Sequence, residues 1–189
     1  MVDNAKTGIV ESVKDSIVAV ITGTGDIVKA VADTISGMVS TLAKDTGKTG
    51  AALIGSLQDI IGATISGTVT AGKSIGDAVK GLTIGTLKGL GSIGEEAYSA
   101  IGSLASSIIK TTATAGGDVM DATKGMLSGV IHSAKDLGVD AEKAVSEAAT
   151  GAVKAAYEIS KEVGDKVKQA ATGTIDGIKV VIKEPFAKK

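Results

Sequence analysis

An eleven-residue repeat is the feature that most constrains what this chain can fold into. From Gly8 the sequence divides into 16 consecutive units of eleven, without insertion or deletion, as far as Lys183. Places two, three, six and nine hold hydrophobic residues in 13, 13, 11 and 14 of the 16 units, whereas place four holds none and is charged in 11. Eleven residues make three turns at about 3.67 residues per turn, so the apolar places share one face of a helix. The period therefore predicts amphipathic α-helix.

The phase of this repeat is continuous, and turns between helices usually reset it. We therefore expect an all-α protein in which residues 8–183 form one very long amphipathic helix of sixteen repeats, with a lead-in at 1–7 and a C-terminal tail at 184–189. Such helices would pack in a parallel homo-oligomeric bundle, barrel or filament. A bundle of shorter helices is the alternative, and its turns would lie in the glycine-rich segments Thr46–Gly50 and Ala115–Asp118.

Glycine makes up 26 of the 189 residues, against one phenylalanine and two tyrosines. Because glycine costs about 1 kcal/mol relative to alanine inside a helix, an isolated rod of this composition would unravel without a partner. Places one and five are mostly small, and small residues allow helix backbones to approach closely. We expect copies of the chain to be partners, and the glycines predicted to make helix–helix contacts are Gly67, Gly89, Gly129, Gly151, Gly173 and Gly177.

A longer spacing of 44 residues lies over the repeat. It relates four aspartates at place four, a charge ladder made of Asp33, Asp77, Asp121 and Asp165. Acids at place one recur every 22 residues in the C-terminal half, at Glu96, Asp118, Asp140 and Glu162. Such a ladder could set the stagger between neighbouring helices, or it could be a solvated face inherited through duplication.

Composition argues against several classes of function. The chain has no cysteine and a single histidine, His132, so we expect no metal site. All 20 basic residues are lysine and the net charge is -1, which does not favour binding to nucleic acid. No paired carboxylates suited to acid–base chemistry are apparent, and we predict neither an enzyme nor a cofactor. No signal peptide or standard transmembrane span is visible, and the cellular location is left open.

One short motif resembles a nucleotide-binding loop. The segment from Gly67 through Gly72 and Lys73 to Ser74 matches the pattern G-x-x-x-x-G-K-[ST], whose backbone amides hold phosphates. The glycine and serine fall where the repeat already favours small residues, and we find no strand pattern before the segment. We interpret the match as a chance match.

Units such as ATKGMLSGVIHSAKD and AATGAVKAAYEIS resemble the repeat regions of perilipins, synucleins and exchangeable apolipoproteins, and also right-handed hendecad coiled coils. The resemblance is one of periodicity and composition over nearly the whole chain. It implies a long helix that coats lipid surfaces. We expect a non-enzymatic structural protein that self-assembles into a helical barrel, tube or filament, with a membrane-associated or membrane-crossing form as a variant. A coat protein on lipid droplets or membranes is the alternative.

Overall fold

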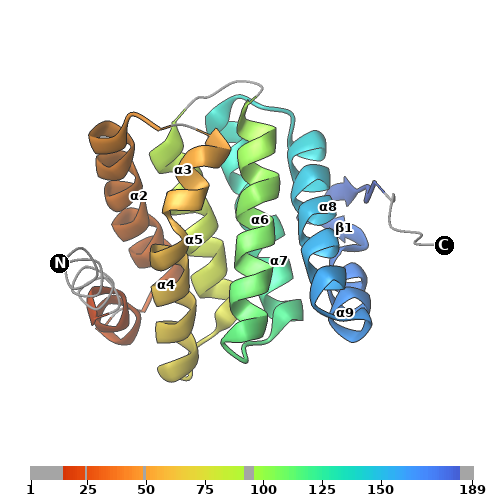
Figure 1. The fold of residues 1–189 in the computed structure, drawn as a ribbon, viewed down its shortest axis with the longest axis horizontal. Coiled ribbons are helices and arrows are strands. Elements are labelled where there is room, and N and C mark those ends of the chain that lie inside the picture. Colours follow the sequence, from red (N-terminus) through yellow and green to blue (C-terminus); the bar gives the residue numbers. More distant parts are fainter. Residues whose placement is uncertain (1–14, 24, 49, 92–95, 184–189) are drawn as a thin grey trace.

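The computed structural model describes residues 15–23, 25–48, 50–91 and 96–183, and it shows separate helices packed together (Figure 1). A helix covers residues 15–23. The elements after it are α2 (Ile27–Thr46), α3 (Gly50–Ser56), α4 (Gln58–Thr70), α5 (Ile75–Leu90), α6 (Glu96–Thr114), α7 (Val119–Leu137), α8 (Ala141–Ile159), α9 (Lys161–Ala171), β1 (Gly173–Ile175) and β2 (Ile178–Val180). The expected single helix over 8–183 is therefore wrong, and with it the bundle or barrel of such helices. The lead-in at 1–7 and the tail at 184–189 lie outside the described residues.

Glycines in the left-handed backbone conformation interrupt the helices. Residues with a side chain rarely adopt a positive φ, because their Cβ would crowd the backbone. Four such glycines lie 22 or 44 residues apart and have φ between +53° and +72°. Gly50 is the first residue of α3, and Gly72, Gly116 and Gly138 lie in the turns before α5, α7 and α8. Each sends the chain out of the helical path at the same place of the repeat.

Side-chain caps then start the next helix. Ser74 Oγ accepts from the Asp77 N–H at 3.1 Å, Asp140 Oδ1 from the Lys143 N–H at 2.7 Å, and Ser160 Oγ from the Val163 N–H at 3.2 Å. These bonds satisfy amides that have no partner inside the helix. Helices α5 to α9 begin at residues 75, 96, 119, 141 and 161. One helix with its turn takes 20 to 23 residues, close to two units of eleven, so the turns leave the phase of the repeat unchanged.

Asp118 is the cap whose removal we expect to cost most. Its Oδ1 accepts from the N–H groups of Met120 at 2.8 Å and Asp121 at 3.1 Å. Asp118→Ala should lower the free energy of unfolding by about 1 kcal/mol, because both amides lose their acceptor. Urea unfolding followed by circular dichroism measures the change. Asp118→Ser, which retains a capping oxygen, is the control, and a loss as large as that of alanine would contradict the assignment.

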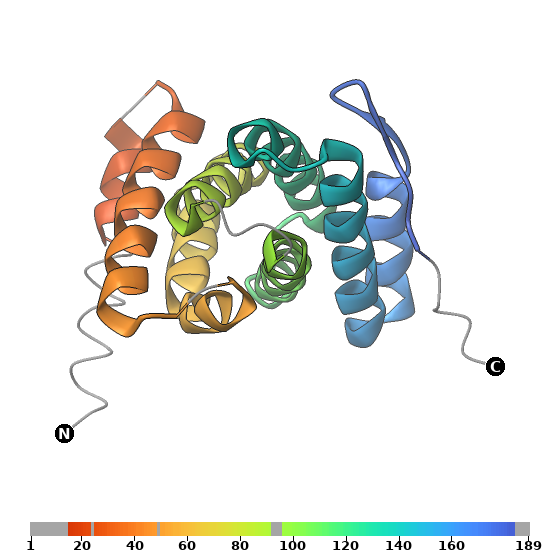
Figure 2. The ribbon, with the colours of Figure 1, turned by 90° about the horizontal axis from the view of Figure 1, so that it is seen from above.

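The helices lie in two rows, seen from above in Figure 2. One row contains α2, α5, α7 and α9, and the other contains α3 with α4, then α6 and α8. Neighbours in a row are two helices apart in sequence when the bent pair of α3 and α4 is counted as one. Contacts that advance together along both helices show that α2 and α5 are parallel, and likewise α5 and α7. Aliphatic and alanine side chains fill the space between the rows, including Ile35, Leu82, Leu104 and Val153, each at most 1% exposed.

Glycine allows neighbouring helices in a row to touch through their backbones. A Cβ on Gly125 of α7 would lie 2.0 Å from the carbonyl oxygen of Gly76 in α5, and a Cβ on Gly151 of α8 would lie 2.5 Å from that of Gly102 in α6. A Cβ on Gly81 of α5 would likewise lie 2.6 Å from the carbonyl oxygen of Val28 in α2. No side chain fits at these positions, so much of the high glycine content serves contacts within one chain.

The chain ends in a small antiparallel hairpin. Strands β1 and β2 pair Ile175 with Ile178 across a two-residue turn of Asp176 and Gly177. Both turn residues have positive φ, 47° and 83°, the geometry that Asp-Gly provides in tight hairpins. The last repeat unit is therefore a hairpin and not a helix.

Candidate functional site

The aspartates of the charge ladder lie in four different helices of one row, but their environments differ. Asp33 of α2 forms an ion pair with Lys29, and the hydrogen bond and charge of Lys29 lower the pKa of Asp33 below 3.8. Asp77 lies in the first turn of α5. Asp121 of α7 accepts a hydrogen bond from the Gly76 N–H at 2.7 Å, and Asp165 of α9 accepts one from the Tyr157 hydroxyl at 2.8 Å. The ladder therefore does not form one uniform row of free carboxylates.

Three of these aspartates line two neighbouring grooves on the outside of α2, α5 and α7. Lys80 of α5 lines both grooves. We call this surface the charged face, and it comprises Lys29, Asp33, Asp77, Lys80, Lys88, Asp121 and Lys124. Asp26 and Asp176 line the same two grooves, so lysines and aspartates are close in number and the surface carries little net charge. The sequence predicts the charge ladder, and the fold places lysines of the same and neighbouring helices beside its aspartates.

The groove between α5, α7 and α9 has a volume of about 540 Å³ and extends to the hairpin. The Asp121 carboxylate already occupies the amino end of α5, where an anion would otherwise be favoured. Asp176 at the hairpin tip accepts a hydrogen bond from Ser128 at 2.5 Å. These carboxylates make the groove unfavourable for phosphate. Within the described residues, no group of three His, Cys, Asp or Glu side chains is placed to hold a metal ion.

The segment that matches a nucleotide-binding loop joins two helices. Gly67 is buried in α4, Gly72 forms the turn with a φ of +62°, and Lys73 is exposed. Ser74 caps α5. Helix α4 occupies the place where the strand of a nucleotide-binding loop would precede the glycines. Capping and turn geometry account for the glycine and the serine at this position.

Five of the six glycines predicted to make helix–helix contacts divide into two groups, and the sixth, Gly67, is buried in α4. A Cβ built on Gly89 would lie 2.6 Å from Val39 Cβ of α2, and one on Gly129 would lie 2.9 Å from Thr83 Cβ of α5. Gly151 packs against Gly102 of α6, and all three contacts are within one chain. Gly173 and Gly177 lie in the hairpin with positive φ values of 113° and 83°, and a Cβ built on either has no atom of the chain within 4 Å. Their role is to shape the turn.

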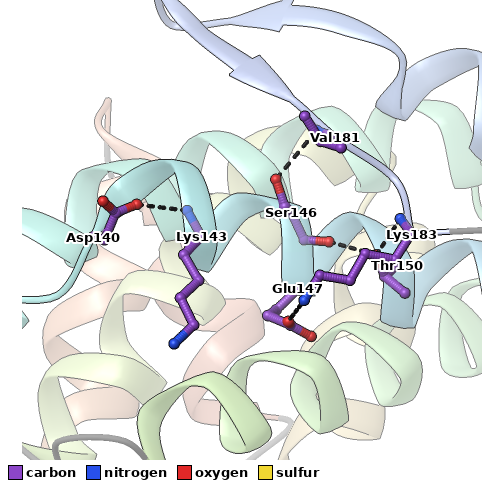
Figure 3. A network of polar contacts seen from close by, with 7 residues as sticks. All are labelled: Asp140, Lys143, Ser146, Glu147, Thr150, Val181 and Lys183. Carbon is purple, nitrogen blue, oxygen red and sulfur yellow. Dashed lines mark hydrogen bonds and ion pairs between the residues drawn. The ribbon is translucent and has the colours of Figure 1, made fainter.

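A C-terminal strap, residues 181–183, lies along α8 after the hairpin (Figure 3). The Val181 N–H donates to Ser146 Oγ at 3.2 Å, and the Lys183 N–H donates to Thr150 Oγ1 at 3.1 Å. The Lys183 ammonium group also forms an ion pair with Glu147. Sequence reasoning missed this strap, although Ser146 and Thr150 follow Gly102 and Ser106 of α6 by 44 residues.

Other ion pairs join neighbouring helices on the surface. Lys110 of α6 lies 2.7 Å from Glu158 of α8, and its hydrogen bond and charge lower the pKa of Glu158 below 4.5. Lys143 of α8 lies over the ring of Tyr98 at 4.0 Å from its centre. Both contacts cross from α6 to α8, so this side of the α8 surface is partly engaged within the chain.

Within the described residues, no single helix is long and apolar enough to cross a membrane, and only the bent pair of α3 and α4, with 55° between them, passes that test together. A scan against protein-family models and a search of curated proteins find no match to this chain.

Proposed function

We propose that this chain is a non-enzymatic structural protein that associates with copies of itself through the charged face. The observation that carries the proposal is the mixture of lysines and aspartates over α2, α5 and α7. A surface with both signs and little net charge can be complementary to the same surface of a second copy, because lysines of one copy can lie opposite aspartates of the other. Assembly would then use folded molecules and not long helices.

The lipid-coating alternative makes a different demand on the fold. A coat needs apolar side chains at the lipid interface. Among the described residues, the large hydrophobic side chains that are exposed are Ile159, at 43%, and Val181, at 55%. The helices would have to leave their core contacts to present an apolar face. Association through the charged face needs no such rearrangement and is the better supported proposal.

A charge-swap experiment tests the charged face. One full-length variant carries Lys80→Asp with Lys124→Asp, and the other carries Asp33→Lys with Asp77→Lys. Each variant alone should self-associate less than the wild type in sedimentation velocity, whereas their mixture should form mixed complexes. Association should weaken at about 1 M salt, where the Debye length is about 3 Å.

Lys161→Asp with Lys179→Asp makes the same change of net charge as Lys80→Asp with Lys124→Asp, away from the charged face, and serves as the matched control for that variant. If the wild type is monomeric at every soluble concentration and the two swap variants do not combine, the proposal is wrong. Flotation with anionic vesicles is run in parallel. Vesicle binding by a protein that does not self-associate would favour the lipid-coating alternative.

A further inference from the structure

The C-terminal strap lies where a further helix of its row would lie. In this row α6 holds α8 through the backbone of Gly102, against Gly151, and through Ser106 Oγ, which donates to the Gly151 carbonyl at 3.1 Å. Forty-four residues after Gly102 and Ser106, the α8 residues Ser146 and Thr150 hold the strap instead. The strap therefore contacts α8 at the positions that correspond, 44 residues earlier, to the helix-contacting residues of α6.

Beside the strap, α8 carries a stripe of alternating charges. Its members are Lys143, Glu147, Lys154 and Glu158, with Thr150 at the centre, and helical geometry places them within about 80° of the circumference. Lys143, Lys154 and Glu158 are exposed. The Glu147 side chain is 28% exposed, and the ammonium group of Lys183 from the strap covers it. Figure 3 shows Glu147 and Lys183 in contact on this side of α8.

The order of these charges is complementary to itself under a two-fold axis. When a second α8 runs antiparallel about a point between Thr150 and Gly151, Glu147 faces Lys154 of the second copy, and Lys143 faces Glu158 of the second copy. Each pair occurs twice by symmetry. Lys143 and Glu158 already have partners on α6, so the two Glu147–Lys154 pairs are the contacts that such a dimer would add.

We propose that α8 is a second self-association surface, which binds a second copy of this chain in an antiparallel two-fold dimer, and that Lys183 of the strap competes with Lys154 of the second copy for Glu147. The proposal shares with the proposed function only the identity of the partner, and it uses a different surface. Two backbone N–H groups and one ion pair hold the strap, together with Ile182, which is half-buried and packs against the core, whereas Val181 is 55% exposed. Exchange of the Lys183 ion pair alone frees Glu147 and leaves the backbone contacts and the packing of Ile182 in place.

Lys183→Ala in the full chain tests the competition. Without the ammonium group, Glu147 is free for the second copy, and the dissociation constant of the dimer should fall by about 2- to 30-fold, the range for two exposed ion pairs. Sedimentation equilibrium measures it. Lys179→Ala on β2 removes the same charge from an exposed position outside the strap and is the matched control. Equal affinity in the Lys183→Ala and Lys179→Ala variants would overturn the proposal.

Charge reversal in the Lys183→Ala background tests the geometry. Glu147→Lys and Lys154→Glu should each weaken the dimer, because like charges then face each other. The double variant should restore it, and a mixture of the two single variants should form heterodimers. Circular dichroism verifies that each variant is folded. A dissociation constant that does not change on these reversals would refute the two-fold pairing. A double variant that dimerises as weakly as either single variant would refute it as well.

These outcomes are separable from those of the charged-face experiment. If the swap variants of α2 and α5 fail to combine but the α8 variants behave as described, the charged face is not the assembly surface while the α8 dimer stands. If the charged-face variants combine and the α8 variants show no effect, only the α8 dimer is wrong.

Discussion

Gly125→Ala is expected to destabilise the fold by about 3 kcal/mol or more, although alanine is the better helix former. The added Cβ would lie 2.0 Å from the Gly76 carbonyl oxygen and 2.7 Å from its carbonyl carbon. Those atoms belong to the backbone of α5 and cannot turn aside as a side chain can. The helices α5 and α7 would have to separate, with loss of packing between their aliphatic neighbours. Urea unfolding monitored by circular dichroism measures the change in the free energy of unfolding.

Gly37→Ala is the matched control, because Gly37 precedes Gly125 by two spacings of 44 residues. Gly37 is exposed on α2, and a Cβ there meets nothing within 4 Å. Alanine should therefore stabilise the protein by up to about 1 kcal/mol through helix propensity alone. Opposite signs at the two positions are the expected result. Equal effects would show that α5 and α7 do not approach as closely as described.

Ile35→Ala is expected to lower the free energy of unfolding by about 2–5 kcal/mol. Ile35 is fully buried, and its Cβ lies 2.8 Å from the point that a Cβ on Gly85 would occupy. Glycine has no side chain that could move into the resulting cavity, so the void should persist. Calorimetric or chemical unfolding of the purified variant measures the loss.

The double variant Ile35→Ala with Gly85→Ala tests this explanation. A Cβ on Gly85 would still lie 2.5 Å from the Ala32 carbonyl oxygen, whatever stands at position 35. We therefore expect no rescue, and the double variant should be less stable than Ile35→Ala alone. Ile159→Ala, at a side chain that is 43% exposed, should cost much less. Recovery of stability in the double variant would contradict the backbone contact.

The positions of several turns are visible in the sequence, but the eleven-residue repeat keeps its phase through them and so gives no sign of a break. Glycines at place ten recur as Gly50, Gly72, Gly94, Gly116 and Gly138, and Ser74, Asp118 and Asp140 follow three of them two residues later. A glycine followed by a capping residue is typical of one helix ending and another beginning. Because one helix with its turn takes about two repeat units, the eleven-residue period continues through each turn without a shift, and the period alone therefore predicts one helix.

The candidate surfaces were only partly predictable for the same reason. The 44-residue spacing identified Asp33, Asp77 and Asp121, and the structure places them with lysines of neighbouring helices. The strap along α8 gave no comparable pattern, because its main contacts run from backbone N–H groups to Ser146 and Thr150. Any residue except proline can donate such bonds, so side-chain patterns do not mark them.

The sequence by itself determined that the chain is helical, which side of each helix is apolar, and that its glycines stand at recurring places. Those properties depend on residues within a few turns of one another, and local periodicity records them. Only the tertiary structure decided that the helices fold back on one another in two rows. That choice depends on which backbone covers each small-residue surface, and contacts such as Gly76 with Gly125 join positions 49 residues apart. A second copy could satisfy the same local pattern, whereas the left-handed glycines in the turns before α5, α7 and α8 let the same chain supply the neighbour.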